Sequence, residues 1–85
     1  MSPRTIIRSV TWTVRQDSEA GAPAAPIYQA ECTTCGEQSA AKEGDRISPE
    51  VWTLQHTGGH PSHRSYRAVV TTFWRVTPSA DSEVE

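Results

Sequence analysis

The stretch AECTTCGEQS, residues 30–39, holds both cysteines of the chain, Cys32 and Cys35, with a glycine directly behind the second. A disulfide across so short a loop would constrain the unfolded chain very little, so the spacing requires another chemical explanation. Two thiolates separated by two residues can both reach one metal ion when the chain makes a tight turn. Gly36 suits such a turn, because glycine adopts backbone conformations that cost other residues more.

The segment LQHTGGHPSHRSY, residues 54–66, contains all three histidines of the chain, and twenty residues separate Cys35 from His56. Thiolates and imidazole nitrogens are the donors that tetrahedral zinc prefers. A Cys-x2-Cys pair followed by clustered histidines at this spacing therefore predicts a zinc site. A redox pair is the main alternative, but such pairs open a helix, and GEQSAAKEG, residues 36–44, is a poor helix start.

Spacing alone leaves the choice of histidines open. His56 and His60 are four residues apart, which suits chelation on an unbroken helix, but Gly58 and Gly59 lie between them. His63 lies beyond the loop, at the entry to the last predicted strand, where the backbone is better anchored. If His60 is not a ligand, we expect it to be exposed to solvent or to act as an outer or exchange ligand.

The segments before and after the cysteines predict strands and loops. Residues 6–14 alternate β-branched and aromatic residues with threonine, serine and arginine, which predicts a half-buried strand. A loop rich in small residues and proline follows at 17–26, and residues 27–31 predict a short strand that leads to Cys32. Residues 37–46 are polar and predict a turn, or a second short strand and a loop.

One short helix is predicted from SPEVWTLQH, residues 48–56. Ser48 can accept hydrogen bonds from the free N–H groups of the first turn, and Pro49 suits the first helical position. Gly58 and Gly59 are expected to end the helix by taking the left-handed conformation of a C-terminal cap.

A long final strand is predicted from SYRAVVTTFWRV, residues 65–76, and is expected to pair with the N-terminal strand, whose pattern it matches. We expect Trp52 and Trp74 to fill the core, as large aromatic residues do in small domains. Trp12 fits either the core or a platform that binds bases or peptides.

These elements predict an α+β fold, a small zinc-finger-like domain with an antiparallel β-sheet of about three strands and one short α-helix. Residues 1–77 form a single zinc-binding domain in this interpretation, and residues 78–85 form a disordered acidic tail. The chain has 85 residues, of which 35% are hydrophobic. A domain of this size has a small core, to which a metal often adds stability.

The sequence also bears on the compartment. No stretch approaches the roughly 20 apolar residues of a membrane span, so no membrane partner is expected. Arg8 and Arg15 interrupt the N-terminal segment and no cleavage site follows an apolar run, which argues against a signal peptide. We therefore expect a cytoplasmic protein, in which a close cysteine pair binds metal more often than it forms a structural disulfide.

The formal net charge is -2, yet all eight basic residues and only five of the ten acidic ones lie outside the first loop and the tail. This mildly basic balance falls well short of a dense nucleic-acid-binding surface. Contact with phosphates would require a shared face for the arginines at positions 8, 64, 67 and 75. Scattered, solvated arginines are the expected arrangement.

The pattern CTTCGEQS … VWTLQHTGGHPSHRSYR … FWRV resembles a group of short, functionally uncharacterised proteins of streptomycetes and related actinomycetes. They share a strand, a CxxC followed by a serine, a Trp-x3-His on a helix, and a P-x-His-x-x-Tyr/Phe step into a final strand. The resemblance extends roughly from Ile6 to Val76. It implies no activity, and it implies that the metal ligands are Cys32, Cys35, His56 and His63.

Three functions fit these features. We favour a binding module with a structural Zn²⁺ and another protein as its target, since four protein ligands leave no position for water or substrate. The protein is then not an enzyme and has no catalytic residues. The alternatives are a nucleic-acid-binding zinc finger that uses an arginine stripe, and a small metal-dependent hydrolase or nuclease, which needs an open coordination position. The sequence does not determine the oligomeric state.

Overall fold

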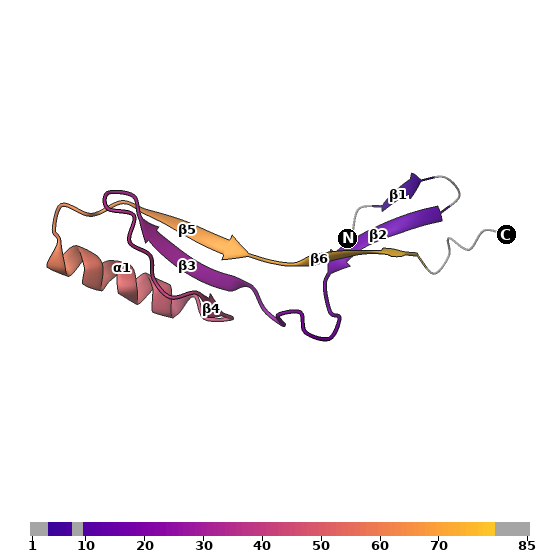
Figure 1. Cartoon of the computed structure of the whole chain (residues 1–85), viewed down its shortest axis with the longest axis horizontal. Helices are drawn as coiled ribbons and strands as arrows, with labels where there is room; N and C mark the ends of the chain where they lie inside the picture. Colours follow the sequence, from indigo (N-terminus) through magenta and orange to yellow (C-terminus); the bar gives the residue numbers. More distant parts are fainter. Residues whose placement is uncertain (1–3, 8–9, 80–85) are drawn as a thin grey trace. The chain divides into compact units, whose positions relative to one another are not determined.

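In the computed structural model, the described residues, 4–7 and 10–79, form six strands and one helix (Figure 1). Side chains are described for residues 11–79. The α+β fold class is confirmed, but the strands form two three-stranded antiparallel sheets and not one. The chain divides into two compact units, of which the second is Pro23–Thr72 and the first comprises the residues on either side of it.

The first unit is a sheet with the strand order β1-β2-β6. β1 (Arg4–Ile7) pairs with β2 (Val10–Gln16), and β2 pairs with β6 (Trp74–Pro78). The single strand predicted over residues 6–14 is therefore wrong in its extent, because it joins the end of β1 to most of β2. Alternation of apolar and polar residues continues in both arms of a hairpin, so this pattern does not mark a reversal.

The strand predicted over residues 65–76 is also two strands, β5 (Tyr66–Thr71) and β6. Its second half pairs with β2, as expected, whereas its first half pairs with β3. Trp74 was expected in the core, and instead 72% of it is exposed. Among the described residues of its own unit, a single sheet layer offers no second layer to cover this side chain.

The end of the first unit extends past the predicted domain boundary. Pro78 is the last residue of β6 and lies opposite Trp12, which is half-buried. The N–H of Ser79 donates to the carbonyl of Thr11 at 2.9 Å. These two residues were assigned to the tail, and the rest of the predicted tail, residues 80–85, lies outside the described residues.

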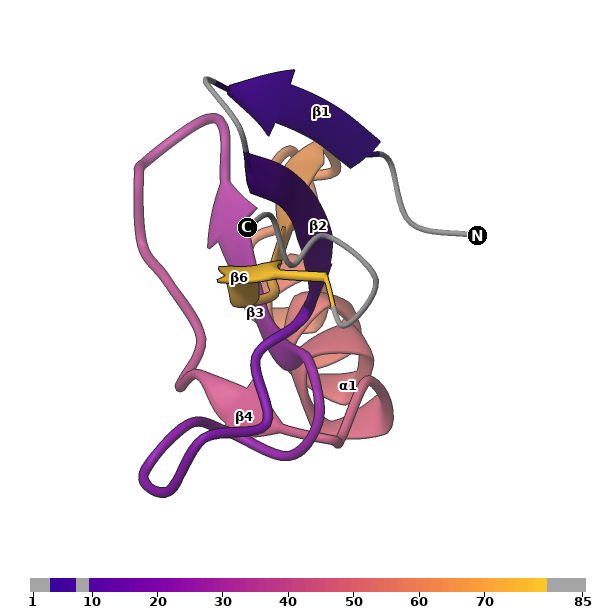
Figure 2. The same cartoon turned by 90° about the vertical axis from the view of Figure 1, so that its right-hand side faces the viewer.

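The second unit packs helix α1 (Ile47–Gly59) against a sheet with the order β4-β3-β5. β3 (Ile27–Cys32) pairs with β5 over its whole length and with β4 (Lys42–Glu43) at its start. α1 runs alongside β3 and in the same direction (Figures 1 and 2), so the C-terminal ends of the two elements are neighbours. This arrangement brings the cysteines at the end of β3 close to the histidines at the end of α1.

The sequence predicted that Ser48 caps the first turn of α1. In the structure the capping side chain is that of Asp45. Oδ1 of Asp45 accepts a hydrogen bond from the Ser48 N–H at 3.0 Å, and its Oδ2 accepts one from the Ser48 hydroxyl at 2.6 Å. The hydrogen bond from the Ser48 hydroxyl lowers the pKa of the Asp45 carboxyl most, and the bond from the Ser48 N–H lowers it further. Aspartate and serine are both good capping residues, so the pattern alone did not distinguish them.

α1 ends at Gly59, as predicted, but by a different mechanism. The described glycines with positive φ are Gly21, Gly36 and Gly44, so neither Gly58 nor Gly59 is left-handed. The helix is closed by His60, which has φ of -140° and whose N–H donates to the carbonyls of His56 and Thr57. No helix among the described residues is long and apolar enough to cross a membrane.

Few side chains are buried. Within residues 11–79 the buried residues are Thr13, Ala30, Cys32, Ser39, Pro49 and His56. The only fully buried side chain in this range is that of Cys32, a small residue at the end of β3. Four of these six residues, Cys32 and His56 among them, come from β3 or α1. The packing of the second unit therefore centres on the cysteine and histidine cluster and not on large apolar side chains.

The backbone conformations predict opposite effects for two glycine substitutions. Gly36→Ala should lower the free energy of unfolding by about 1 kcal/mol or more, because φ at this position is +82°. Gly58→Ala should raise it by about 0.5–1 kcal/mol, because Gly58 is helical and an added Cβ meets nothing within 4 Å. Urea denaturation of both variants in one buffer measures the two effects, and a shift of the same sign in both would contradict these backbone assignments.

Candidate metal centre

The two cysteines lie on a tight turn that ends β3. The N–H of Gly36 donates to the Cys32 carbonyl, and the N–H of Cys32 donates to the Glu37 carbonyl, both at 2.8 Å. Gly36 has the positive φ that its place in the turn required. The N–H and hydroxyl of Thr33 both donate to the carbonyl of Ser65, which ties the turn to the start of β5.

The turn surrounds the sulfur atoms with hydrogen-bond donors, and both cysteines are reduced. Burial opposes ionisation of Cys32, but the backbone N–H groups of Cys35 and Thr34, with their side chains, outweigh it and lower the pKa of its thiol. The N–H of Glu37 favours the Cys35 thiolate, yet burial and the adjacent Cys32 and Glu37 raise the pKa of that thiol. Ionisation of one thiol therefore opposes ionisation of the other, and a cation between the two sulfur atoms would favour both thiolates.

α1 and the loop after it supply the histidines. His56 lies in the last turn of α1, is 8% exposed, and stacks on the ring of Trp52 one turn earlier, with centroids 4.9 Å apart. His63 lies in the loop, where its N–H donates to the carbonyl of His60 at 2.8 Å. Its own carbonyl accepts a hydrogen bond from the hydroxyl of Thr57 at 2.6 Å.

Tyr66 holds the helix, the loop and β5 together. Its hydroxyl lies 2.7 Å from the hydroxyl of Thr57 and 3.1 Å from the carbonyl oxygens of Thr53 and His63. Its ring meets that of His56 edge-on, at a centroid distance of 6.0 Å. The sequence assigned no role to this tyrosine, although its place three residues after His63 in the P-x-His-x-x-Tyr step marked it as part of the pattern.

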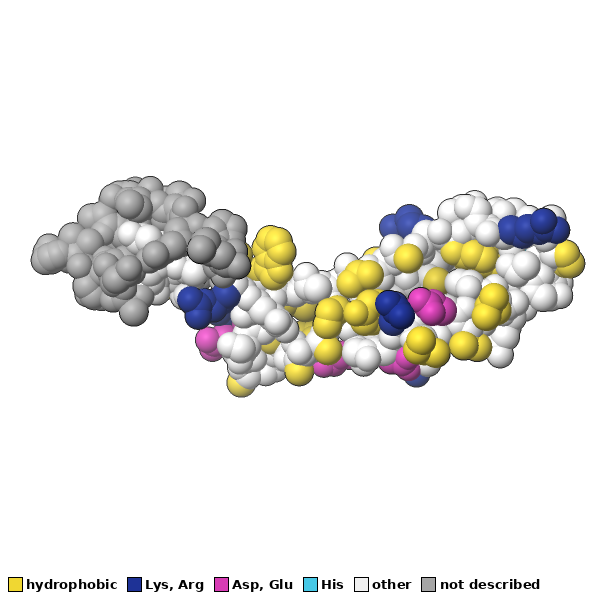
Figure 3. Space-filling model, turned by 180° about the vertical axis from the view of Figure 1, so that it is seen from behind, with side chains coloured by type: hydrophobic (Ala, Val, Ile, Leu, Met, Phe, Trp, Pro, Cys, Tyr) yellow, Lys and Arg dark blue, Asp and Glu magenta, His cyan; other side chains and the backbone are white. Residues whose placement is uncertain are grey.

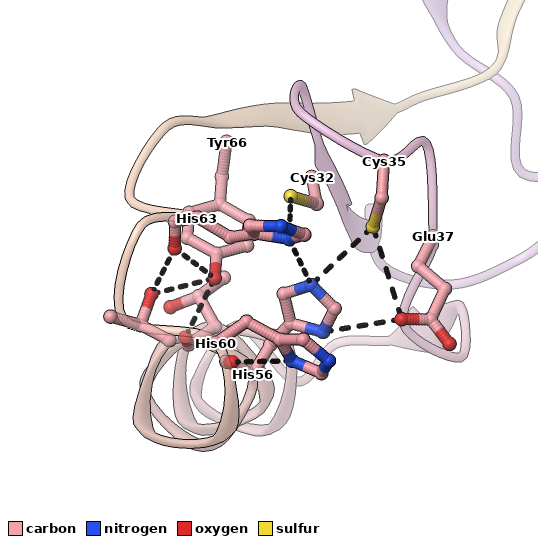
Figure 4. Close-up of polar contacts among 9 residues, drawn as sticks. Cys32, Cys35, Glu37, His56, His60, His63 and Tyr66 are labelled. Carbon is pink, nitrogen blue, oxygen red and sulfur yellow. Dashed lines mark hydrogen bonds and ion pairs between the residues drawn. The ribbon is translucent and has the colours of Figure 1, made fainter.

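Four residues bring donor atoms together between these elements (Figure 4), and these atoms all lie within 4.8 Å of one another. The atoms that face each other are Sγ of Cys32 and Cys35, Nε2 of His56 and Nδ1 of His63. The Cys32–His63 distance is 3.6 Å, the Cys35–His56 distance 3.5 Å and the His56–His63 distance 3.3 Å. Tetrahedral zinc, with Zn–S about 2.3 Å and Zn–N about 2.0–2.1 Å, places sulfur and nitrogen about 3.6 Å apart and two nitrogens about 3.3 Å apart. The four residues can therefore hold one metal ion.

The structure thus brings together all four residues that the family resemblance implied as ligands. The remaining histidine, His60, is exposed and lies outside this cluster of donors. Its ring stacks on those of His56 and His63, with centroids 4.8 and 5.0 Å away. Its Nδ1 lies 3.2 Å from the His56 carbonyl, so it covers the cluster from outside.

Glu37 orients one of the candidate ligands, a role that the sequence did not reveal. Its Oε1 lies 3.3 Å from Nδ1 of His56 (Figure 4). A carboxylate in this position accepts the Nδ1 proton and leaves the lone pair of Nε2 directed at the cluster. The same oxygen lies 4.0 Å from Sγ of Cys35.

The fold and the cluster define the class of the protein, a small α+β protein with a two-cysteine, two-histidine cluster that can bind a metal ion. The chain belongs to the family described as Domain of unknown function (DUF7848), which matches residues 1–81. No curated protein and no solved structure matches the chain.

Removal of the carboxylate beside His56 should weaken metal binding without removing a ligand. Glu37→Ala is expected to lower zinc affinity about 10–100-fold, because the imidazole loses the partner that fixes its tautomer and orientation. Competition with a chromophoric chelator measures this affinity. Glu50→Ala is the matched control, since the carboxylate of Glu50 pairs with exposed Arg46 in the first turn of α1. An equal loss in both variants would contradict the role of Glu37.

Proposed function

We propose that the chain is a zinc-stabilised binding module, in which the cluster holds one structural Zn²⁺ and the surface of the same unit binds another protein. The observation that carries the proposal is the convergence of four donor atoms within 4.8 Å, three of whose separations match edges of a zinc tetrahedron. Two sulfur and two nitrogen donors in this geometry favour zinc over the harder cations.

A structural role follows from the number of donors. Four protein ligands complete the coordination shell, so no position remains for a water molecule or a substrate. A hydrolytic metal needs such an open position. His60, the one histidine outside the cluster, has its Nδ1 beside a carbonyl and its ring stacked on the two candidate ligands, which suits a covering role better than a catalytic one.

The scarcity of buried side chains indicates why this chain would need a metal. Burial of apolar surface is the main favourable term in folding, and few residues of this protein are buried. The cluster joins the end of β3, the end of α1 and the loop before β5. A bound ion therefore supplies free energy of folding that side-chain packing in the second unit does not.

The surface of the second unit supports a protein partner. α1 exposes an apolar stripe, which consists of Ile47, Val51 and Leu54. Beside α1 lies an apolar groove of about 160 Å³ between the helix and the sheet, with Pro49, Thr53, Ala68 and Val70 among its lining residues. Hydrophobic side chains gather on this unit in the space-filling view (Figure 3). Exposed apolar surface of this kind is typical of protein-binding sites.

The arginines give less support to nucleic-acid binding. Arg67 pairs with Glu31 at 2.6 Å, and Arg75 pairs with Asp17 at 2.9 Å. Phosphates would have to displace these carboxylates. The guanidinium of Arg64 donates to a loop carbonyl, and the remaining arginine of the suggested stripe, at position 8, lies outside the described residues.

Two histidine substitutions distinguish a ligand from a neighbour of the site. His63→Ala should abolish zinc binding and unfold much of the second unit, because it removes one of four donors. His60→Ala should retain about one zinc ion per chain and the native circular dichroism spectrum, because His60 lies outside the cluster. Zinc content and circular dichroism of both purified variants provide the measurement, and the reverse pattern would contradict the ligand assignment.

The partner surface can be tested by a matched pair on α1. Leu54→Asp places a charge on the apolar stripe, where 73% of the leucine is exposed, so it should remove a partner without unfolding the protein. Gln55→Asp is the control, since Gln55 is an exposed polar residue of the same helix and its replacement adds the same charge without removing an apolar side chain. Proteins crosslinked to each variant in extract of the source organism are compared by quantitative mass spectrometry. A protein captured by the wild type and by Gln55→Asp, but at least about tenfold less by Leu54→Asp, is expected; equal capture by all three would contradict the proposal.

A further inference from the structure

The two cysteines of the cluster differ in their access to solvent. Cys32 is 0% exposed at the end of β3, whereas Cys35 is exposed on the turn, and both are reduced. Their donor atoms nevertheless lie within 4.8 Å of each other. Cys35 is therefore the cysteine that a small solute can approach, and both sulfur atoms belong to the same cluster (Figure 4).

We propose that this asymmetry makes the centre a peroxide-sensitive switch, in which hydrogen peroxide oxidises Cys35, Cys32 closes a disulfide with it, and the zinc ion is released. The inference rests on the proposed zinc site and assigns a regulation to it. Both cysteines are thiolates in the proposed zinc-bound centre, so exposure decides which of them peroxide reaches, and Cys35 is the exposed one.

The chemistry balances with hydrogen peroxide as the only oxidant. The Cys35 thiolate attacks one peroxide oxygen and the O–O bond breaks, which gives a sulfenic acid and hydroxide. The Cys32 thiolate then attacks the Cys35 sulfur and displaces a second hydroxide as the S–S bond forms. The cysteine pair loses two electrons to the peroxide, and two protons from solvent convert both hydroxides to water.

The consequence for the fold follows from the donor set. The thiolate is the form of cysteine that binds zinc, so a disulfide removes two of the four ligands. His56 and His63 alone do not complete a tetrahedral shell. Since few other residues of the second unit are buried, loss of the ion would loosen the end of α1 from the end of β3 and leave the hydrogen bonds of Tyr66 as the remaining link. Reduction of the disulfide by a thiol restores the ligands, so the switch is reversible.

The charge beside Cys35 selects the kind of oxidant. The carboxylate of Glu37, which is 68% exposed, lies 4.0 Å from the Cys35 sulfur. An anionic oxidant such as glutathione disulfide meets this negative charge, whereas hydrogen peroxide is neutral. A small neutral peroxide is therefore the class of oxidant that the site admits.

The experiment treats the full-length, zinc-loaded protein with hydrogen peroxide, after its zinc content has been measured. Released zinc is followed with a chromophoric chelator, and intact mass reports the disulfide as the loss of two hydrogen atoms. Brief exposure with dimedone traps the sulfenic acid for peptide mapping. We expect about one zinc ion released per chain, a disulfide, dimedone on Cys35, and recovery of zinc binding after reduction and addition of zinc.

Cys35→His provides a control, because it cannot form the disulfide, so its intact mass should show no loss of two hydrogen atoms under peroxide. The wild-type protein tests the inference even if this variant does not fold. Zinc retained at peroxide concentrations that oxidise free cysteine, dimedone on Cys32, or zinc loss without a disulfide would each overturn the switch while leaving the zinc site intact. A purified wild-type chain that binds no zinc contradicts the proposed function itself, and the switch with it.

Discussion

Four donor atoms that converge within 4.8 Å are the constraint on which the second unit of this protein depends. They come from a turn after β3, from the last turn of α1 and from the loop before β5, so one ion would join three separate segments. Large apolar side chains do not take over this task, since the only fully buried side chain within residues 11–79 is that of Cys32. In the proposed function, metal binding and folding of the unit would therefore be one process.

The surroundings of the cluster show how a small chain positions ligands without a large core. Glu37 fixes the orientation of His56, and Tyr66 and Thr57 hold the carbonyl of His63 by hydrogen bonds. These contacts use polar groups close to the site, so they determine its geometry at little cost in buried apolar surface. Because the unit has so small a core, the apolar stripe on α1 stays exposed, and this is where we propose that a partner binds.

The sequence predicted the cluster better than it predicted the strands. Cysteine and histidine are few in this chain, and their chemistry limits what a close spacing can mean, so a metal site could be predicted from them. Spacing did not decide between His60 and His63, and the family resemblance supplied that choice. Strand ends and strand partners depend on which segments meet in space. The alternating pattern of residues 65–76 does not show that the first half of this segment pairs with β3 and the second half with β2. For the same reason Trp74, an aromatic residue in an alternating pattern, was expected in the core. Glu37 went unrecognised because a polar residue in a turn has no distinctive pattern.

X-ray absorption at the zinc K-edge on the purified, full-length protein tests the central claim most directly, because it reports the atoms bound to the ion. We predict a shell of about two sulfur atoms near 2.3 Å and two imidazole nitrogens near 2.0–2.1 Å, with no water ligand. A shell made only of nitrogen and oxygen, or a protein that contains no zinc after purification in zinc-supplemented buffer, would contradict a structural zinc site at Cys32, Cys35, His56 and His63.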